Sequence, residues 1–248
     1  MERVAAIVLA GGRGTRFKGI IKSSKQKVLT EIPPGRKLID YTMDLLPPGL
    51  VRRVVFGLGY RGVDVKRWAQ EQGFVYEHIE FRYHRRRSVL NAILTSCKGI
   101  PEKTIVVCNA DELHLGLNLE EVVAFHEQRR AVCTLVATVR SHLYRNRVLT
   151  VDEATSQVIS HEYNPIRMKE HPEVRGIVNC GIAVVDRSFV SYMRDDHPST
   201  GWDAIIDPLC EKRLALACLL PSITHFNVGT EEEYLDAMTF LKRGAATT

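Results

Sequence analysis

Apolar and amphipathic segments alternate regularly along the first half of the chain. Short runs rich in Val and Ile are typical of buried strands. The stretches between them repeat apolar residues every three or four positions, which is typical of helices. Strands are expected at residues 4–8, 51–58, 74–79, 104–108 and 131–139, and helices at 61–72, 87–97 and 119–130. Strand–helix–strand units place their strands parallel, so this half predicts a parallel sheet with right-handed crossovers.

The pattern changes after residue 140. Strands are expected at 148–151, 157–160, 176–185, 214–220 and 224–228, and helices at 202–212 and 231–241. The first two of these strands predict a hairpin across Asp152-Glu153-Ala154-Thr155. We therefore predict one α/β domain over residues 1–248: a Rossmann-like, three-layer α/β/α fold with a predominantly parallel central sheet and a small mixed substrate lobe.

A glycine-rich turn directly follows the first strand, where open α/β sheets bind their ligands. It reads Leu9-Ala10-Gly11-Gly12-Arg13-Gly14-Thr15-Arg16-Phe17. Its glycines allow backbone amides to approach an anion closely. Arg13 and Arg16 add guanidinium groups, which bind phosphate oxygens in a bidentate manner. The turn therefore predicts binding of a polyphosphate.

Two other phosphate-binding motifs fit this turn less well. A P-loop requires Gly-Lys-Ser/Thr, which is absent. A dinucleotide fingerprint requires a third glycine where Phe17 stands, and an acidic residue about 20 positions later, where the chain is rich in Lys and Pro. A plain strand-to-helix turn is the remaining alternative, although two arginines in a tight turn favour a bound anion.

A candidate metal ligand follows the strand at 104–108, in Asn109-Ala110-Asp111. Asp111 is expected on the same rim of the sheet as the glycine turn. Mg2+ takes one or two carboxylates together with phosphate oxygens and water, so Asp111 facing a triphosphate suits that ion. The alternatives are a turn aspartate that caps the next segment of the chain, and Glu112 in the metal role.

Two more groups of residues are candidates for the same site. Asn227 ends a strand and could supply an amide oxygen to the metal, or the segment is a turn with Thr230 capping the next helix. Lys22, Lys25 and Lys27 could neutralise phosphates or form a solvated basic loop. Lys27 is favoured because the apolar residues Val28-Leu29 follow it.

Composition narrows the class of protein. The net charge of +5 is mild, and although residues 84–87 read His-Arg-Arg-Arg, the chain has no basic stripe with interleaved aromatics, so no nucleic-acid partner is expected. The six cysteines are scattered without a Cys-x-x-Cys pair and are expected to be small core residues. We find no signal peptide and no apolar run near the ~20 residues that span a bilayer, so a reducing, cytoplasmic location with no membrane partner is expected.

These pieces together resemble the sugar-phosphate nucleotidyltransferases, also called NDP-sugar pyrophosphorylases. The family opens with L-A-G-G-x-G-T-R-L and a downstream lysine, here Leu9 to Phe17 and Lys27. It continues with V-x-x-G-Y, N-G-D, N-A-G-I-Y-V and D-x-G-T-P-E-D-Y. The corresponding segments are Phe56-Gly57-Leu58-Gly59-Tyr60, Asn109-Ala110-Asp111, Asn179-Cys180-Gly181-Ile182-Ala183-Val184 and Asn227-Val228-Gly229-Thr230-Glu231-Glu232-Glu233-Tyr234. The match runs in register over residues 4 to 240.

The resemblance implies the nucleotidyltransferase fold, a nucleotide-binding half over about residues 1–140 and an acceptor-binding half over about 141–248. It implies that a sugar 1-phosphate attacks a nucleoside triphosphate, that Mg2+ is the cofactor, and that a homodimer is possible. Arg16, Lys27 and Asp111 would be catalytic, and Asp111 and Asn227 would hold the metal. The nucleotide would be bound by Leu9, Ala10, Gly11, Gly12, Arg13, Gly14, Thr15, Asn91 and Asn109, and the sugar phosphate by Asn179, Glu162 and Arg167.

The sequence departs from the family pattern in four places. Asn227 replaces an aspartate, and Val28 replaces the usual proline. The E-K-P motif appears as Glu162-Tyr163-Asn164-Pro165 without its lysine, which leaves Arg167 or Lys169 as replacements. The base-reading loop, at residues 87–92, has no glycine.

Three functions are compatible with these residues. Guanylyl or cytidylyl transfer to a sugar 1-phosphate is favoured. The others are cytidylyl transfer to a non-sugar phosphate such as phosphocholine, inositol phosphate or a phosphonate, and a non-catalytic nucleotide-binding regulatory subunit.

Overall fold

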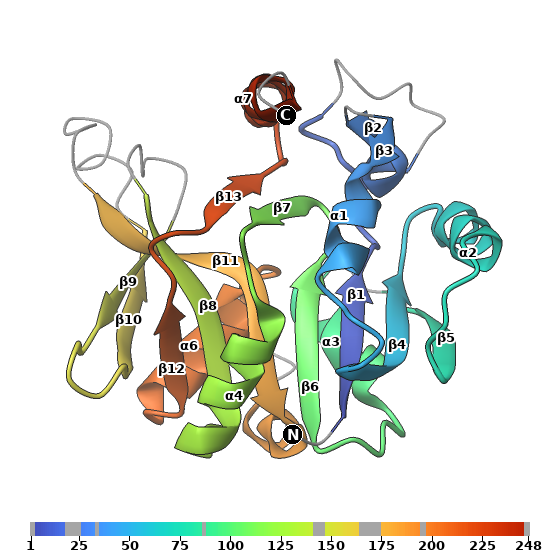
Figure 1. Ribbon diagram of the computed structural model, residues 1–248. Helices are drawn as coiled ribbons and strands as arrows, with labels where there is room; N and C mark the ends of the chain where they lie inside the picture. Colours follow the sequence, from blue (N-terminus) through green and yellow to red (C-terminus); the bar gives the residue numbers. More distant parts are fainter. Residues whose placement is uncertain are drawn as a thin grey trace.

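The apolar runs of the first half form four parallel strands. The computed structural model describes residues 3–17, 26–32, 35–85, 88–140, 147–163, 175–193 and 197–245 (Figure 1). The strands are β1 (Val4–Leu9), β4 (Val51–Leu58), β5 (His78–Tyr83) and β6 (Thr104–Asn109). They lie side by side in the order β6-β1-β4-β5, and every neighbouring pair is parallel. The parallel sheet expected from the sequence is confirmed.

The second half extends the same sheet with mixed pairings. Its strands are β8 (Cys133–Arg140), β9 (Val148–Val151), β10 (Val158–Glu162), β11 (Gly176–Asp186) and β12 (Ala215–Leu219). β11 runs antiparallel to β6, β8 and β9, whereas β12 pairs parallel with β8. One nine-stranded sheet therefore runs through both halves of the chain. Because β11 pairs with β6, residues of the second half lie in the centre of this sheet.

Helices cover both faces of this sheet. They are α1 (Leu38–Asp44), α2 (Gly62–Glu71), α3 (Val89–Cys97), α4 (Leu119–Arg129) and α6 (Asp203–Glu211). The side chains of β1 alternate between the layers, as the two-residue period of a strand requires. Ala6 and Val8 pack with residues of α1, α2 and α4, whereas Ala5 and Ile7 pack with residues of α3 and α6. The α/β/α arrangement expected from the sequence is confirmed.

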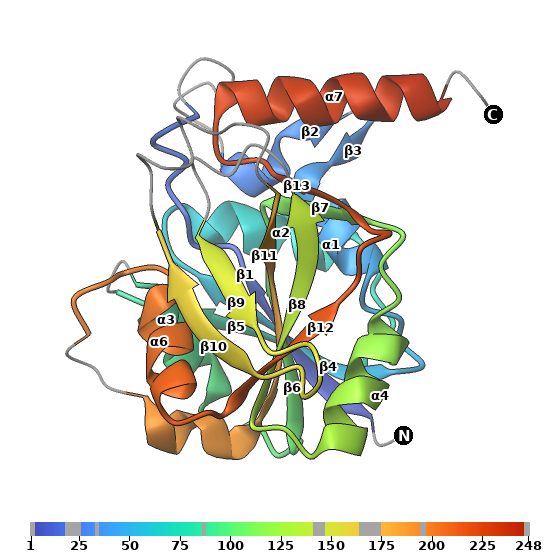
Figure 2. The ribbon, with the colours of Figure 1, turned by 90° about the vertical axis from the view of Figure 1, so that its left-hand side faces the viewer.

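A small upper layer lies beyond the carboxyl ends of the parallel strands. It contains η1 (Lys27–Leu29), the two-stranded sheet of β2 (Glu31–Ile32) and β3 (Arg36–Lys37), the ribbon of β7 (Glu112–Leu115) and β13 (Thr224–Asn227), and α7 (Glu231–Ala245). Figure 2 shows α7 lying across the top of the molecule, over β2, β3 and β13. Phe17, Leu113, Val228 and Ala237 form its separate apolar core together with Leu38.

One predicted strand is displaced in the structure, and one strand was not predicted. The strand expected at 74–79 is wrong, because the strand is His78–Tyr83. Phe74 and Tyr76 instead form an aromatic cluster with Trp68 at the end of α2. β7 was missed because its sequence, Glu-Leu-His-Leu, has polar residues on the face that the ribbon buries.

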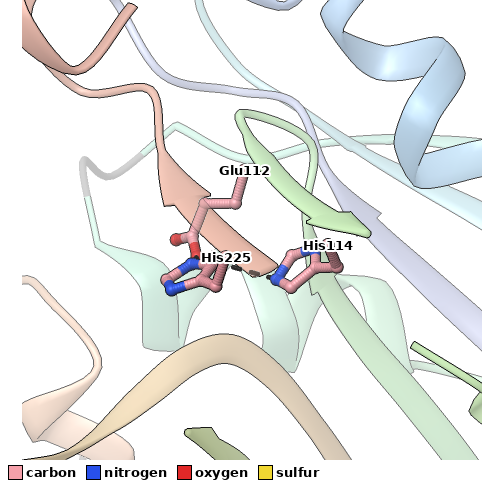
Figure 3. Close-up of side chains that lie close together, drawn as sticks. All are labelled: Glu112, His114 and His225. Carbon is pink, nitrogen blue, oxygen red and sulfur yellow. Dashed lines mark hydrogen bonds and ion pairs between the residues drawn. The ribbon is translucent and has the colours of Figure 1, made fainter. Parts of the chain in front are cut away.

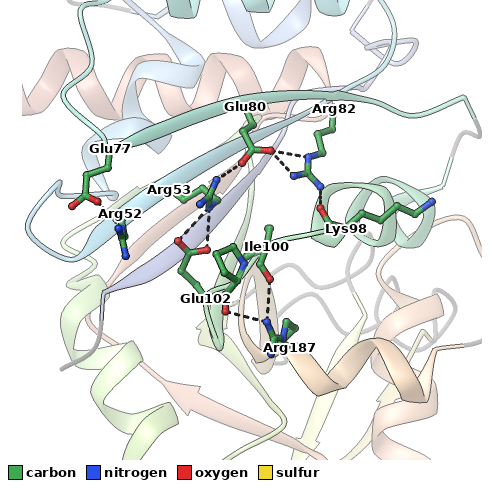
Figure 4. A network of polar contacts seen from close by, with 10 residues as sticks. Arg52, Arg53, Glu77, Glu80, Arg82, Lys98, Ile100, Glu102 and Arg187 are labelled. Atoms are coloured by element: carbon green, nitrogen blue, oxygen red, sulfur yellow. Dashed lines mark hydrogen bonds and ion pairs between the residues drawn. The ribbon is translucent and has the colours of Figure 1, made fainter.

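Charged side chains fix the end of the sheet opposite the glycine turn. Figure 4 shows Arg53 of β4 between Glu80 of β5 and Glu102, which precedes β6. Nearby, Arg187 of η3 (Arg187–Tyr192) donates to the carbonyl oxygens of Ile100 and Pro101. These contacts join β4, β5 and the segment before β6 to one another and to η3, so they stabilise the scaffold.

All six cysteines are unpaired thiols; five are buried and Cys210 is partly exposed. Burial raises the pKa of the Cys108 thiol to about 12, which makes it unreactive at neutral pH. The expectation that the cysteines are core residues is therefore confirmed for five of them. Among the described residues, no helix combines the length and the apolar character needed to cross a bilayer.

Candidate active site

The glycine turn begins where β1 ends and lies against the end of β4. Ala10 N donates to Gly57 O at 2.9 Å, and Tyr60 N donates to Gly11 O at 3.1 Å. A Cβ at Gly11 would lie 2.4 Å from His84 Nε2 and 3.0 Å from Gly59 N. The two backbone segments can approach this closely only because both Gly11 and Gly59 lack side chains.

A buried glutamine holds the turn from behind, and the sequence analysis missed it. Gln26 is 1% exposed, and its Nε2 lies 3.0 Å from Ala10 O, 3.2 Å from Gly12 O and 2.8 Å from Tyr60 O. These contacts fix two carbonyl groups of the turn beside the segment that follows β4. An isolated glutamine beside a lysine-rich segment carries no motif, and no sequence signal could have identified it.

A cleft of about 610 Å³ opens beside the turn. The turn contributes Gly11, Gly12, Arg13, Thr15 and Arg16 to its lining. Both arginines are exposed, and Arg13 lies over the ring of Tyr60 at 5.3 Å. Exposed guanidinium groups beside backbone amides are the kind of groups that bind anions.

Lys27 and Asp111 meet on the opposite wall of the cleft. Lys27 Nζ lies 2.6 Å from Asp111 Oδ2, although 84 positions separate the two residues. The lysine side chain is 5% exposed and the aspartate side chain 34% exposed. The lysine side chain is therefore almost completely enclosed, while the aspartate carboxylate keeps accessible surface for a ligand or a cation.

Asn227 lies directly beside Asp111. The register of β13 on β7 pairs Asn227 with Glu112, and Val228 N donates to Asp111 O at 3.1 Å. Next along the chain, a Cβ at Gly229 would lie 3.1 Å from Asn227 Oδ1 and 3.8 Å from Arg16 Nη2. Asn227 therefore lies close to both the aspartate and the arginine of the turn.

The start of α7 fixes the segment that follows Asn227. Thr230 and Glu233 form a reciprocal cap: Glu233 N donates to Thr230 Oγ1 at 3.3 Å, and Gly229 N donates to Glu233 Oε2 at 3.0 Å. The expectation that Thr230 caps a helix is confirmed. This cap does not exclude the metal role of Asn227, because the asparagine precedes it and lines the cleft.

The far end of the cleft is formed by the start of α3 and by the segment before α6. Ser88, Val89 and Ala92 line it on one side, and Thr200 and Trp202 on the other. Val89 N donates to Thr200 O at 2.9 Å, which holds the two segments together. Trp202 Nε1 is buried and lacks a hydrogen-bond partner within the described ranges. Residues beyond position 140 thus line the same cleft as the glycine turn.

Most of the predicted site residues line this cleft. They are Leu9, Gly11, Gly12, Arg13, Thr15, Arg16, Lys27, Asn109, Asp111 and Asn227. Ala10 is fully buried behind the turn, and Gly14 allows the turn through its φ of 62°. Asn109 donates its Nδ2 to Glu112 Oε1 at 2.6 Å, so that nitrogen is already engaged.

The other predicted residues lie elsewhere. Asn91 is in the first turn of α3, directly before the lining residue Ala92 and three positions after Ser88, but is not itself among the residues that line the cleft. Glu162, also absent from that lining, ends β10 and is exposed. Asn179 lies on β11, and its Oδ1 is buried without a partner among the described residues. Arg167, Lys169, Lys22 and Lys25 lie outside the described residues.

Comparison with known proteins gives the family. The family model described as "Nucleotidyl transferase" matches residues 5–244. The bifunctional protein GlmU of Pelobacter propionicus is 30% identical over 155 residues, which covers 62% of this chain and 32% of that protein. The chain therefore spans about a third of the length of this relative.

Solved structures share the fold over nearly the whole chain. HddC from Yersinia pseudotuberculosis, complexed with GMP-PN, has a TM-score of 0.72 at 19% identity, covering 96% of this chain and 99% of that one. A protein from Bacillus anthracis named as a glucose-1-phosphate thymidylyltransferase, in complex with sucrose, has a TM-score of 0.76 at 17% identity, covering 96% and 94%. Together with the match over residues 5–244, the fold establishes that this chain belongs to the nucleotidyl transferase family.

Proposed function

We propose that the protein transfers a nucleotidyl group from a nucleoside triphosphate to a sugar 1-phosphate, giving an NDP-sugar and pyrophosphate. The observation that carries this proposal is the convergence of the glycine turn, Arg16 and the Lys27–Asp111 pair on one cleft. Such a site would suit a triphosphate, because amides of the turn and two cationic side chains line the same cleft.

The reaction requires positioning and charge neutralisation rather than a covalent intermediate. A phosphate oxygen of the acceptor attacks the α-phosphorus in line, and the bond from that phosphorus to the β-bridging oxygen breaks. Arg16, exposed at the end of the turn, would bind the leaving pyrophosphate. Lys27 would stabilise charge at the α-phosphate, because its ammonium group is fixed at the cleft wall.

Asp111 and Asn227 fit a magnesium ion. Both line the cleft, both offer oxygen ligands, and the carboxylate of Asp111 is partly exposed. Mg2+ bound there would neutralise phosphate oxygens of the nucleotide. Lys27, already paired with the same carboxylate, would keep Asp111 oriented toward the ion.

The acceptor is proposed to bind beside β11. Asn179 Oδ1 is buried and lacks a partner among the described residues. This amide oxygen could accept a hydrogen bond from a sugar hydroxyl. Glu162 and Arg167 are proposed to contact the sugar and its phosphate. A non-sugar phosphate acceptor remains the second candidate, supported by the loss of the lysine from the Glu162-Tyr163-Asn164-Pro165 segment.

Guanylyl or cytidylyl transfer is the proposed base specificity. Arg85 and Trp202 both line the cleft, and both side chains carry N–H donors that could meet a base. Guanine offers the acceptors O6 and N7 to such groups, and a bidentate arginine pair with them is a common means of recognition. The structural similarity to HddC, which was complexed with GMP-PN, is compatible with this choice.

Thermal denaturation with each of ATP, CTP, GTP, UTP and dTTP, with and without Mg2+, tests the nucleotide assignment. GTP or CTP at 100 times its dissociation constant is expected to stabilise the protein by about 2.7 kcal/mol, seen as a rise in Tm. The rise should be larger with Mg2+ than without it. No shift with any triphosphate would refute the assignment of the glycine turn to phosphate binding.

A further inference from the structure

Three buried polar side chains share one face of the β7–β13 ribbon. Glu112 and His114 are two positions apart on β7 and so project to the same side, and the antiparallel register places His225 opposite His114. Their exposed fractions are 5%, 5% and 8%, respectively. Figure 3 shows the carboxylate of Glu112 directed at the His225 ring, with the His114 ring beside it. The sequence analysis considered only Glu112 of the three.

Glu112 contacts three parts of the active site at once. Its Oε1 accepts from Asn109 Nδ2 at 2.6 Å, and its Oε2 accepts from His225 Nε2 at 2.7 Å. A Cβ at Gly181 would lie 2.4 Å from Oε1, so the carboxylate packs directly against the backbone of β11. Gly181 has a φ of 64°, in the region that favours glycine.

His114 connects the ribbon to the same turn of β11. Its Nε2 lies 2.6 Å from Cys180 O, and its ring stacks on that of His225 with centroids 5.1 Å apart. Burial, followed by the proximity of His225, lowers the pKa of His114 to about 4, so the ring is neutral at pH 7. A neutral ring has one N–H, and the short contact to a carbonyl oxygen assigns it to Nε2.

The composition of this cluster also suits a metal ion, since ligand atoms of all three residues lie within 4.8 Å of one another. The Nε2 atoms of both histidines are already used in hydrogen bonds, one to a carbonyl and one to a carboxylate. Both Nδ1 atoms are buried without a partner among the described residues, so a metal ion would have to bind through them. The hydrogen bonds at Nε2 join the strands, and the proposal below rests on them.

We propose that Glu112 and His225 form a hydrogen-bonded clamp that positions the active-site strands relative to one another. Asp111 precedes Glu112, Asn227 follows His225 by two positions, and Asn179 precedes the Cys180-Gly181 turn against which the clamp packs. The hydrogen bond therefore keeps the two proposed metal ligands together and ties them to the acceptor strand. Glu112 and His225 are positioning residues, and the proposal rests on the function proposed above.

Two substitutions at position 225 separate the hydrogen bond from the packing. His225→Phe keeps a ring that can stack on His114 but removes the donor to Glu112. His225→Gln loses the ring but keeps an N–H donor close to the position of Nε2. His126→Phe is the matched control, because it removes another buried histidine, which contacts Thr134 Oγ1 at 3.0 Å between α4 and β8.

The readout is Mn2+ binding followed by electron paramagnetic resonance, with GTP or CTP present, together with KM for the acceptor. His225→Phe is expected to weaken Mn2+ binding about tenfold, because a hydrogen bond to a charged group is lost. KM for the acceptor should rise as well, since the clamp packs on β11. His225→Gln is expected to restore most of the Mn2+ affinity and to bring KM for the acceptor close to its original value. His126→Phe should match the unmodified protein in both measurements.

Different outcomes overturn different claims. If His225→Phe binds Mn2+ as the unmodified protein does, the clamp is refuted and the proposed function stands. If the purified protein contains one equivalent of zinc that both position-225 variants lose, the cluster is a metal site and the clamp is again refuted. If the unmodified protein binds no Mn2+ with any triphosphate, the proposed function fails and the clamp fails with it.

Discussion

Replacing Asp111 with asparagine is expected to lower kcat by about 10²–10³-fold, the range measured when one preorganised electrostatic group is removed from an active site. The substitution keeps the size and one oxygen of the side chain but removes the charge that pairs with Lys27 at 2.6 Å. A neutral amide would bind Mg2+ more weakly and would no longer orient the ammonium group. Steady-state kinetics of pyrophosphate release measure the effect.

The same substitution affects stability as well as catalysis. Lys27 is 5% exposed, so removing its carboxylate partner leaves a buried charge unpaired. Asp111→Asn should therefore lower Tm, and adding Lys27→Met should recover part of the loss without restoring turnover. Asp44→Asn, at an exposed ion pair with Arg36, serves as the control for loss of a surface carboxylate. Normal turnover in Asp111→Asn would refute the assigned role of Asp111.

Replacing Gly59 with alanine is expected to weaken triphosphate binding at least about tenfold. The new Cβ would lie 2.7 Å from Gly11 O and 3.1 Å from Gly11 Cα, so the backbone of the glycine turn would have to move. Forcing a methyl group into a packed site typically costs about 1–3 kcal/mol, and about 1.4 kcal/mol corresponds to tenfold in affinity. Isothermal titration calorimetry with the preferred triphosphate measures the change.

Gly49→Ala is the matched control for this experiment. Gly49 is exposed, and a Cβ there would meet nothing within 4 Å, so both affinity and Tm should remain unchanged. If Gly59→Ala binds the triphosphate as tightly as the unmodified protein, the close approach of the two glycines does not shape the binding site.

The parallel core and the glycine turn could be predicted from the sequence because both are local signals. Apolar runs define buried strands, and a cluster of glycines directly after the first strand is typical of a turn that binds a phosphate. The strand expected at 74–79 was wrong because Phe74 packs on Trp68 and Tyr76 packs on Phe74 instead of entering the sheet. An apolar run indicates that its residues are buried, but it does not indicate whether they pack inside the sheet or against a helix.

The contacts inside the site could not be predicted in the same way. The family resemblance placed Lys27 and Asp111 in one site, but their contact across 84 positions is a property of the tertiary structure. Gln26 and His225 act through a backbone segment and a buried carboxylate, and neither belongs to a recognisable motif. Roles assigned to Asn91, Glu162 and Arg167 stay predictions.

The most direct test of the proposed function is transfer of an α-32P-labelled triphosphate in the presence of Mg2+ to a panel of hexose and heptose 1-phosphates. The prediction is that label appears in an NDP-sugar, with one pyrophosphate released for each triphosphate consumed, and that Asp111→Asn slows both by about 10²–10³-fold. The contradicting result is a protein that binds the triphosphate but transfers label to no sugar 1-phosphate. Transfer to phosphocholine or another non-sugar phosphate instead would keep the chemistry and replace the acceptor.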